Sequence, residues 1–383
     1  MTGQPFHVVH VSPRVQARGG IETLLEHYRH LPLAQSFVAL FDRRPPPRKS
    51  YANLDITWRT PLWVMRRRFA RVLASRGGSL VVYHNGWGLP LFHDLDGAAR
   101  RVVFLHANPP FHAPDLPAMQ GLLDGVGGIT PPLRPLWERL LPEITPERGA
   151  ILPIPIEPPD SPAPPAARPA VPLVLGYAGR VEFGQKRLDR LAPFLKALRA
   201  LGVPFRFEVL GDGTKRRTLE RQFGGEVRFH GWAPKDDFWR IMAGWDAIVF
   251  FSDFEGGPLA VLEAMSQGAI PFYPAIGGGW ADLYAPQVDP RCHYPPGDLP
   301  ALARAIQEVF ARPAVQVAAL RDRARALVRP HCDRSYETDY LTLLRSVMAL
   351  PRLSRPRRRR PRLADALPLG IVTRFASWAL RSS

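Results

Sequence analysis

Short apolar runs alternate with longer, helix-like polar segments along most of the chain. The apolar runs have the length and the aromatic and β-branched content of buried strands. The predicted strands are 7–12, 80–84, 101–105, 173–177, 205–210, 227–230, 247–251 and 270–273. The predicted helices are 21–31, 187–201, 215–222, 259–267 and 300–312. Strands that alternate with helices predict an α/β protein with parallel sheets.

A Pro-rich segment separates two such series. Residues 153–172 are rich in Pro and Ala and can form neither a strand ladder nor a helix interior, so they read as a linker. We therefore expect an N-terminal Rossmann-like domain over 1–152 and a C-terminal domain over 173–332. An amphipathic segment, 333–350, is expected to be a helix that returns to the N-terminal domain, and 351–383 forms a separate tail. A length of 383 residues fits two domains.

Charge and cysteine content indicate the kind of partner and the cellular compartment. The net charge is +17, from 51 basic and 34 acidic residues, which favours polyanionic partners such as nucleic acid, anionic lipid or phosphorylated substrates. Cys292 and Cys332 have neither metal-ligand spacing nor a disulfide framework, as in proteins of a reducing cytosol. The N-terminus lacks a signal-peptide pattern, and no apolar stretch is long enough to span a bilayer. These features predict a cytoplasmic protein.

The stretch 253-DFEGGPLAVLEAM-265 is the most informative part of the chain. It places Glu255 and Glu263 between two predicted strands. Gly256 and Gly257 open a turn, and Pro258 fits the first position of a helix. Helix-start amides, a positive dipole end and two carboxylates suit a ligand that carries both anionic and hydroxyl groups. A nucleotide sugar is such a ligand.

Five pieces of the C-terminal half together resemble the nucleotide-binding domain of retaining family-4 glycosyltransferases with the GT-B fold. They are 178-AGRVEFGQKRLDRL-191, 209-VLGDG-213, 229-FHGW-232, 246-DAIVFFSDFEGGPLAVLEAMSQGAIPF-272 and the glycines at 277–279. The resemblance implies an α/β GT-B protein in which the parallel sheets of two Rossmann-like domains face a cleft. Within the family, the chain most suggests α-mannosyltransferases that extend polyprenyl-diphosphate-linked oligosaccharides.

The resemblance also implies roles for residues of the C-terminal half. Arg180 and Lys186 would hold the diphosphate, where fixed cations stabilise the negative charge of the leaving group. Glu263 would accept hydrogen bonds from the ribose hydroxyls. Glu255, with the amides of the two glycines that follow it, would meet the sugar or the diphosphate. The plain alternative for Arg180 and Lys186 is that they are solvated bases. For Glu255 it is a helix-start carboxylate that only favours the dipole, and for Glu263 an ordinary surface glutamate.

Candidates in the N-terminal half are less specific. Gly19 and Gly20 precede a predicted helix and would let the backbone approach a phosphate or sugar, although a structural turn reads the same way. His106 follows a predicted strand, and the resemblance implies that it contacts the donor sugar across the cleft; its alternative is to cap the strand. His84, followed by Asn85, is the competing candidate and a possible acceptor contact.

Metal chemistry is not expected. Asp94-Leu95-Asp96 has the Asp-X-Asp form of a metal site, but it lies in a Gly/Pro-flanked turn. We also find no carboxylates or histidines clustered at metal-ligand spacing. We therefore predict no metal and no other cofactor, with Arg180 and Lys186 in place of a divalent ion.

Two basic segments suggest an anionic membrane surface. Residues 62–76 have one apolar helical face with arginines beside and opposite it, as in a helix that lies in a lipid interface; a core-facing helix with a basic solvent side fits equally. The tail contains 352-RLSRPRRRRPR-362 beside an apolar, Trp-bearing stretch. A tail without any function is the alternative.

The resemblance implies a retaining hexosyltransferase, and the basic segments favour a peripheral location on the inner face of the cell membrane. The expected donor is GDP-mannose, and the expected acceptor is a polyprenyl-diphosphate-linked saccharide of exopolysaccharide or lipopolysaccharide assembly. A transferase that uses UDP-glucose or another UDP-sugar is the nearest alternative. Other classes are a nucleic-acid-binding protein, for which there is no reader motif, and a GT-B-like epimerase or non-catalytic homologue.

Overall fold

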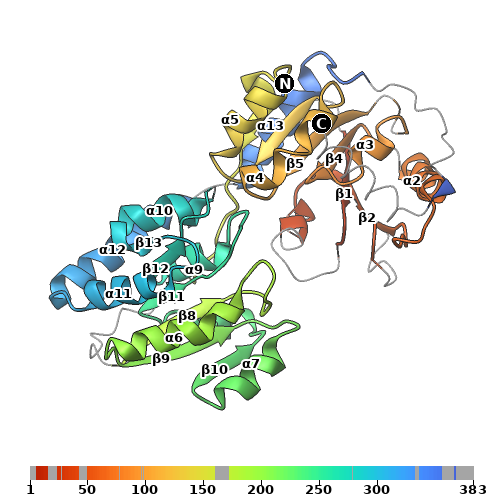
Figure 1. The fold of residues 1–383 in the computed structure, drawn as a ribbon. Helices are drawn as coiled ribbons and strands as arrows, with labels where there is room; N and C mark the ends of the chain where they lie inside the picture. Colours follow the sequence, from red (N-terminus) through yellow and green to blue (C-terminus); the bar gives the residue numbers. More distant parts are fainter. Residues whose placement is uncertain are drawn as a thin grey trace. The chain divides into compact units, whose positions relative to one another are not determined.

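The computed structural model divides the chain into two compact units (Figure 1). Unit 1 comprises Met1–Pro153 with Tyr336–Ser383, and unit 2 comprises Ile154–Ser335. This division lies one residue beyond the expected boundary at 152. The described residues are 6–15, 24–26, 28–42, 50–76, 78–95, 97, 99–159, 172–277, 279–332, 336–355 and 366–367.

In its described part, unit 1 contains a seven-stranded sheet in which all neighbouring strands are parallel. The strands are β1 (His7–Ser12), β2 (Ala34–Ala39), β3 (Tyr51–Asn53), β4 (Leu80–His84), β5 (Arg100–Leu105), β6 (Gly125–Gly128) and β7 (Gly149–Ile151). Their order is β3-β2-β1-β4-β5-β6-β7, so the chain winds outward in both directions from β1. In such sheets, ligands bind beyond the carboxyl ends of the strands where the direction reverses, here at β1 and β4.

Helices and short 3-10 turns belong to unit 1 as well. They are α2 (Leu62–Arg76), α3 (Leu89–Phe92), α4 (Pro109–His112), η1 (Leu116–Met119), α5 (Leu133–Leu140), η2 (Pro146–Arg148) and α13 (Tyr336–Ala349). The last of these is the helix expected at 333–350, and it belongs to unit 1. It contacts η2, and its face made by Tyr336, Tyr340 and Leu344 is buried.

The strand β6 consists largely of glycine because its neighbours leave no room for side chains. A Cβ atom on Gly127 would lie 2.3 Å from the Phe104 ring, and one on Gly125 would lie 2.5 Å from a methyl of Val347 in α13. This strand was not predicted, because a run of glycines also marks turns. The requirement for glycine comes from residues that are distant in sequence.

The apolar face of α2 belongs to the core of unit 1. Leu62, Met65 and Phe69 are at most 1% exposed, so they are not available to a lipid surface. Arg66 donates to Asp94 at 2.7 Å, and Arg68 donates to the carbonyl of Leu54 at 2.7 Å. The core-facing alternative for 62–76 is therefore the one observed, and the predicted interfacial helix is wrong. Asp94 of the Asp-X-Asp sequence is an ion-pair partner of this helix.

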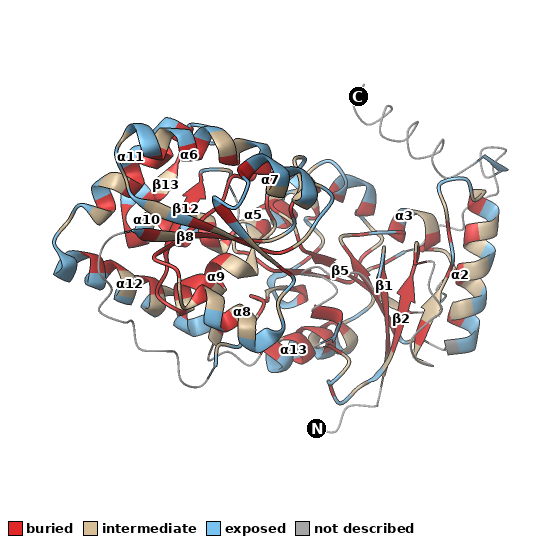
Figure 2. Ribbon diagram, turned by 90° about the horizontal axis from the view of Figure 1, so that it is seen from below, coloured by how far each residue is buried: buried red, intermediate tan, exposed pale blue. Residues whose placement is uncertain are grey.

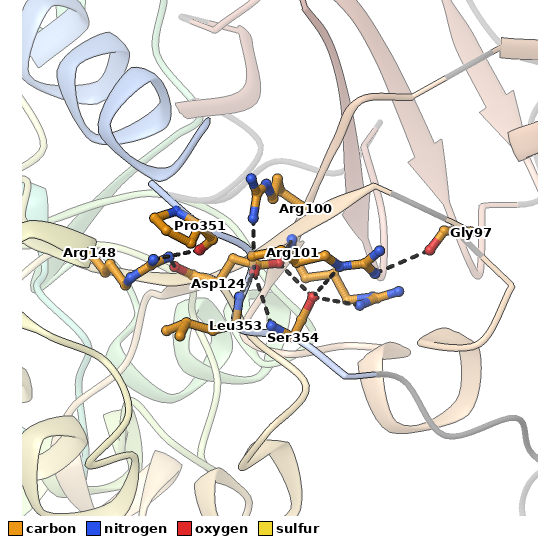
Figure 3. A network of polar contacts seen from close by, with 9 residues as sticks. Gly97, Arg100, Arg101, Asp124, Arg148, Pro351, Leu353 and Ser354 are labelled. Atoms are coloured by element: carbon orange, nitrogen blue, oxygen red, sulfur yellow. Dashed lines mark hydrogen bonds and ion pairs between the residues drawn. The ribbon is translucent and has the colours of Figure 1, made fainter. Parts of the chain in front are cut away.

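A buried carboxylate holds the segment that follows α13 (Figure 3). Asp124 is fully buried and accepts hydrogen bonds from the amides of Leu353 and Ser354 at 2.8 and 3.0 Å. Arg148 donates to the carbonyl of Pro351 at 2.6 Å. Burial acts to raise the pKa of Asp124, but the hydrogen bonds from Ser354 and other donors outweigh it, and the pKa is lowered. We call Pro351–Arg355 with these partners the clasp. The first five residues of the expected tail, 351–383, are therefore bonded to unit 1, and a truncation that tests the rest of the tail must keep them.

Unit 2 contains a second doubly wound parallel sheet, with six strands in the described part. The strands are β8 (Leu173–Ala178), β9 (Phe205–Leu210), β10 (Val227–Gly231), β11 (Ala247–Val249), β12 (Ile270–Pro274) and β13 (His293–Tyr294). Their order is β10-β9-β8-β11-β12-β13, which places the reversal between β8 and β11. Most predicted strands of this half agree within two residues, and β13 was not predicted.

Helices pack around this sheet and enclose one continuous hydrophobic core (Figure 2). They are η3 (Leu188–Arg190), α6 (Leu191–Ala200), α7 (Arg216–Phe223), α8 (Lys235–Met242), α9 (Leu259–Ser266), α10 (Trp280–Val288), η4 (Pro290–Cys292), α11 (Leu299–Phe310) and α12 (Ala314–Cys332). Trp245 lies against Gly176 of β8, where any Cβ atom would clash with its ring. Within the described residues, no helix is both long and apolar enough to cross a bilayer.

Candidate functional site

Two loops of unit 2 meet where the direction of its sheet reverses. The strands β8 and β11 are hydrogen-bonded neighbours, so the segments that leave their carboxyl ends start side by side. One of these segments carries Arg180 and Lys186, and the other carries Ser252 and Glu255. The amide of Asp253 donates to the carbonyl of Gln185 at 3.1 Å and joins the two segments. The fold thus brings together residues that lie about 70 positions apart in sequence.

A buried ion pair links the two loops. Lys186 Nζ lies 2.6 Å from Glu255 Oε1, and their side chains are 11% and 4% exposed. Ser252 Oγ donates to the same carboxylate oxygen at 2.6 Å, and Gln185 Nε2 donates to the other oxygen at 3.3 Å. Lys186 also lies over the Phe250 ring, 5.9 Å from its centroid. The carboxylate therefore holds the ammonium group in place, while the other N–H groups of Lys186 can donate to a ligand.

Arg180 lies beside this pair and is more exposed. Its guanidinium donates to Gln185 Oε1 at 2.7 Å and to Glu182 at 2.9 Å, and its side chain is 49% exposed. Gln185 thus bridges Arg180 and Glu255. Because Gln185 contacts both groups, it couples the position of the exposed cation to that of the buried carboxylate.

Further ion pairs fix the same two loops, and sequence reasoning missed them. Arg187 has φ 52°, a left-handed conformation that is uncommon for residues with side chains, and it pairs with Asp253 at 2.6 Å. Arg190 pairs with Asp253 at 2.7 Å and donates to the carbonyl of Phe251 at 2.6 Å. Ser252 and Gln185 were missed as well. Their positions in the sequence could have indicated them, since each lies within three residues of a predicted site residue.

The helix α9 begins at the loop that carries Glu255. It starts at Leu259, as expected, but Pro258 is its N-cap residue and not its first helical residue, and no side chain caps its first amides. Gly257 has φ 151°, which favours glycine, and the Cβ position of Gly279 lies 3.8 Å from Gly257 Cα. Backbone N–H groups and the positive dipole end therefore remain available to an anion at this turn.

Glu263 lies in the second turn of α9. Its side chain is half-buried, and no hydrogen bond to its carboxylate is seen within the described residues. Burial raises the pKa of Glu263 to about 7, and the positive charge of Lys235 partly opposes this shift. A desolvated carboxylate without a partner can accept hydrogen bonds from ligand hydroxyl groups.

The residues predicted in the N-terminal half have different outcomes. His106 directly follows β5 and is 8% exposed. His84 is fully buried and hydrogen-bonded to other histidine rings, so the acceptor contact considered for it is wrong. Gly19 and Gly20 lie outside the described residues. Among the residues that the structure describes, no group of three or more His, Cys, Asp or Glu side chains could hold a metal ion.

Comparison with known proteins gives matches to glycosyltransferases. Residues 172–312 match the family model "Glycosyl transferases group 1". The lipopolysaccharide 1,6-galactosyltransferase of Escherichia coli (strain K12) is 30% identical over 143 residues, which cover 35% of this chain and 39% of that enzyme. The matched segment thus spans well under half of this curated relative.

Solved structures match over a larger part of the chain. The apo form of a lipopolysaccharide outer core galactosyltransferase has a TM-score of 0.65 at 19% identity and covers 89% of this chain and 99% of that one. The Anabaena protein HepE in complex with UDP-glucose has a TM-score of 0.66 at 16% identity, covering 90% and 100%. The chain has the GT-B fold. The predicted fold class is confirmed.

We expect Arg180→Ala and Lys186→Ala each to lower turnover of the donor by about 100-fold, the usual effect of losing one preorganised donor. They should differ in stability. Arg180 is half-exposed, so its loss should leave Tm nearly unchanged, whereas Lys186→Ala leaves a buried carboxylate unpaired and should cost about 3 kcal/mol of unfolding free energy. Kinetics and thermal unfolding measure the two effects, with Arg240→Ala, which removes an exposed arginine of α8, as control. Turnover close to wild type in both variants would remove the assignment.

The raised pKa of Glu263 leads to a pH prediction. Below pH 7 its carboxyl group is protonated in the free protein, and hydroxyl donors of a bound nucleotide favour the carboxylate. Nucleotide affinity should therefore rise as the pH increases through about 7, and Glu263→Gln should weaken binding and remove this increment. Calorimetry of both proteins with the same nucleotide cancels the titration of the phosphate itself. Glu308→Gln, an exposed glutamate of α11, is the control; an unchanged pH profile in Glu263→Gln would contradict the prediction.

Proposed function

We propose that this protein transfers a hexose from a nucleotide sugar to a hydroxyl group of a saccharide acceptor. The observation that carries the proposal is the buried Lys186–Glu255 pair at the sheet reversal, next to Arg180. Removal of both charges from water costs free energy that offsets most of their attraction, so the buried pair contributes little to stability by itself. A cation held in this way beside an uncapped helix start suits a nucleoside diphosphate.

In the proposed reaction, Lys186 and Arg180 stabilise the diphosphate as the glycosidic bond breaks and negative charge moves onto the leaving oxygen. Because the cations are held in advance, little reorganisation is needed at that moment. Glu263 binds the ribose hydroxyls, and Glu255 with Gly256, Gly257 and the start of α9 surrounds the sugar end. We propose retention of the anomeric configuration, with the departing phosphate accepting the proton of the acceptor hydroxyl.

The family resemblance and the matched proteins favour different donors. The sequence resemblance favours GDP-mannose. The proteins that match this chain support the alternative, a UDP-hexose, since one relative is a galactosyltransferase and one solved neighbour was determined with UDP-glucose. We propose a UDP-hexose as the first donor to test and GDP-mannose as the second.

The acceptor is proposed to be a lipid-linked saccharide at the inner face of the membrane. Support comes from the relatives that act in lipopolysaccharide synthesis and from the arginine-rich sequence 352–362. Most of that sequence and the apolar stretch after it lie outside the described residues. The helix α2 does not contribute its apolar face, for the reason given above.

A panel of UDP- and GDP-sugars tests the proposed function. We expect one UDP-hexose to raise Tm and to be slowly hydrolysed, with hydrolysis continuing in EDTA because the cations are side chains. The matched control is Lys186→Ala with the same donor. Stabilisation by GDP-mannose alone would overturn the UDP proposal. Binding of nucleic acid that weakens with salt, with no turnover of any donor, would overturn the transferase proposal in favour of the nucleic-acid-binding class.

A truncation after Arg355 tests the membrane proposal while keeping the clasp. We expect the full chain to bind vesicles that contain anionic phosphatidylglycerol and the truncated chain to lose most of this binding, because each arginine near such a surface contributes about 1 kcal/mol. Sedimentation with vesicles measures the difference, and an unchanged Tm shows that the clasp is intact. Equal binding by the two chains would contradict a role for the tail.

A further inference from the structure

Three histidines form a continuous row of hydrogen bonds in the sheet of unit 1. His10 Nδ1 lies 3.2 Å from His84 Nε2, and His84 Nδ1 lies 2.8 Å from His106 Nε2. At the other end of the row, His10 Nε2 lies 3.1 Å from Gln35 Oε1. We call this series, Gln35–His10–His84–His106, the histidine row.

The register of the sheet explains the row. Gln35 pairs with Val8, and His10 lies two residues further along β1. His10 pairs with Val82, and His84 lies two residues further along β4. His84 pairs with Phe104, and His106 lies two residues beyond it. A step of two residues keeps each side chain on the same face of the sheet, so the row climbs diagonally to the carboxyl end of β5.

Packing holds the rings in place. His10 is stacked between Tyr28 and Phe37, with ring centroids 5.0 and 4.9 Å away and interplanar angles of 17° and 9°. His84 and His106 are stacked at 5.0 Å. The amide of His106 donates to Asn85 Oδ1 at 2.6 Å, which also fixes the backbone at the end of the row.

The direction of the hydrogen bonds is set at Gln35. Its Nε2 group donates to the backbone carbonyls of Tyr28 and Leu31, and carbonyls only accept. Its Oε1 atom therefore faces His10 and must accept from His10 Nε2. In a neutral imidazole one nitrogen donates and the other accepts, so His10 Nδ1 accepts from His84. By the same rule His84 Nδ1 accepts from His106 Nε2.

The row ends at a nitrogen without a partner. If His106 donates from Nε2, its Nδ1 atom carries a lone pair, and this atom is buried with no hydrogen bond among the described residues. The neighbouring His112 does not fill the place, because its Nε2 atom accepts from the amide of Ala107 at 3.1 Å.

The rule for neutral rings applies because burial disfavours protonation. Desolvation lowers the pKa of His10 and of His106 to about 3, and lowers that of His84 as well. The titratable groups that act on the row are the neighbouring histidines and the stacked tyrosines Tyr28 and Tyr340. None of these brings a negative charge at neutral pH.

We propose that Gln35, His10 and His84 are positioning residues that fix His106 as a hydrogen-bond acceptor at Nδ1 for a sugar hydroxyl group. The proposal rests on the proposed function for the identity of that ligand, but the state of His106 does not. An acceptor nitrogen binds a hydroxyl through its proton and leaves the hydroxyl oxygen electron-rich. An Nδ1–H group would instead donate to the oxygen. The direction of the hydrogen bonds in the row therefore decides whether the sugar hydroxyl donates to His106 or accepts from it.

The first test reads the tautomer without any ligand. In long-range proton–nitrogen spectra of the ¹⁵N-labelled protein, the Nδ1 and Nε2 signals of a neutral histidine differ according to which nitrogen carries the proton. We expect His106 to be protonated at Nε2 from pH 8 down to about pH 5, with its signals assigned by their loss in His106→Gln. Protonation at Nδ1 in the wild-type protein would overturn the proposal, whatever the protein is later found to catalyse.

The second test separates positioning from folding. His84→Leu keeps the volume but breaks the row, whereas His84→Gln retains one donor and one acceptor. We expect His84→Leu to give mixed tautomers of His106 and to lower kcat/KM for the sugar nucleotide about tenfold, the effect of one hydrogen bond, with partial rescue in His84→Gln. His7→Gln is the control, since His7 lies on β1 at an odd step from His10 and therefore on the other face.

The readouts distinguish the possible sugars and the possible failures. Reduced donor hydrolysis in His84→Leu assigns the hydroxyl to the donor, and reduced transfer with unchanged hydrolysis assigns it to the acceptor. The affinity for the nucleoside diphosphate alone should not change. A changed tautomer with unchanged kinetics, or a loss of diphosphate affinity equal to the loss of turnover, would overturn the role of the row. Absence of turnover in the wild-type protein would instead remove the proposed function.

Discussion

The ion pair between Lys186 and Glu255 depends on the winding of the second sheet. Only because β8 and β11 are neighbours at the reversal do their following loops meet, and only then can a lysine reach a glutamate 69 residues away. Removal of both charges from water costs several kcal/mol, which their attraction repays only with good geometry and added hydrogen bonds. Ser252 and Gln185 supply those bonds here. An arrangement with so little net gain in stability is better explained by what the held cation can bind.

In each unit, polar groups lie at the carboxyl ends of the strands where the direction of the sheet reverses. In unit 2 the reversal carries the ion pair, Arg180 and the start of α9. In unit 1 it carries the histidine row, in which β1 and β4 provide the first two rings and the chain beyond β5 provides the last. In each case buried neighbours determine the state of a group at the carboxyl ends of the strands. Glu255 keeps Lys186 in place, and Gln35 sets the direction of hydrogen bonds at His106.

Much of the fold could be predicted from sequence, and the failures have physical causes. Strands of β-branched and aromatic residues, such as His7–Ser12 and Phe205–Leu210, were predicted with their observed bounds. The strand Gly125–Gly128 was not, because its glycines are required by Phe104, Trp137 and Val347 rather than by local conformation. The helix at 62–76 was predicted correctly, but periodicity cannot tell a core from a lipid surface.

The candidate site was predictable in its positions and less so in its contacts. Local motifs indicated Glu255 and Lys186 separately, but nothing in the sequence near either residue indicates that they form a pair. The burial that raises the pKa of Glu263 depends on the packing of the whole helix. The sequence indicated no role for His10, and His84 was considered as an acceptor contact. Their actual relation depends on the register of three strands, which a single sequence does not reveal.

We propose that side chains of unit 2, rather than a divalent ion, bind the second phosphate of the donor. Calorimetry of the nucleoside diphosphate and the corresponding monophosphate in EDTA tests this most directly, since the two ligands differ only in that phosphate. We predict that the wild-type protein binds the diphosphate at least about tenfold more tightly, because charge-assisted hydrogen bonds contribute about 1.5–3 kcal/mol. In Lys186→Met the advantage should largely disappear. Equal affinities in the wild-type protein, or an advantage that Lys186→Met retains in full, would contradict the claim.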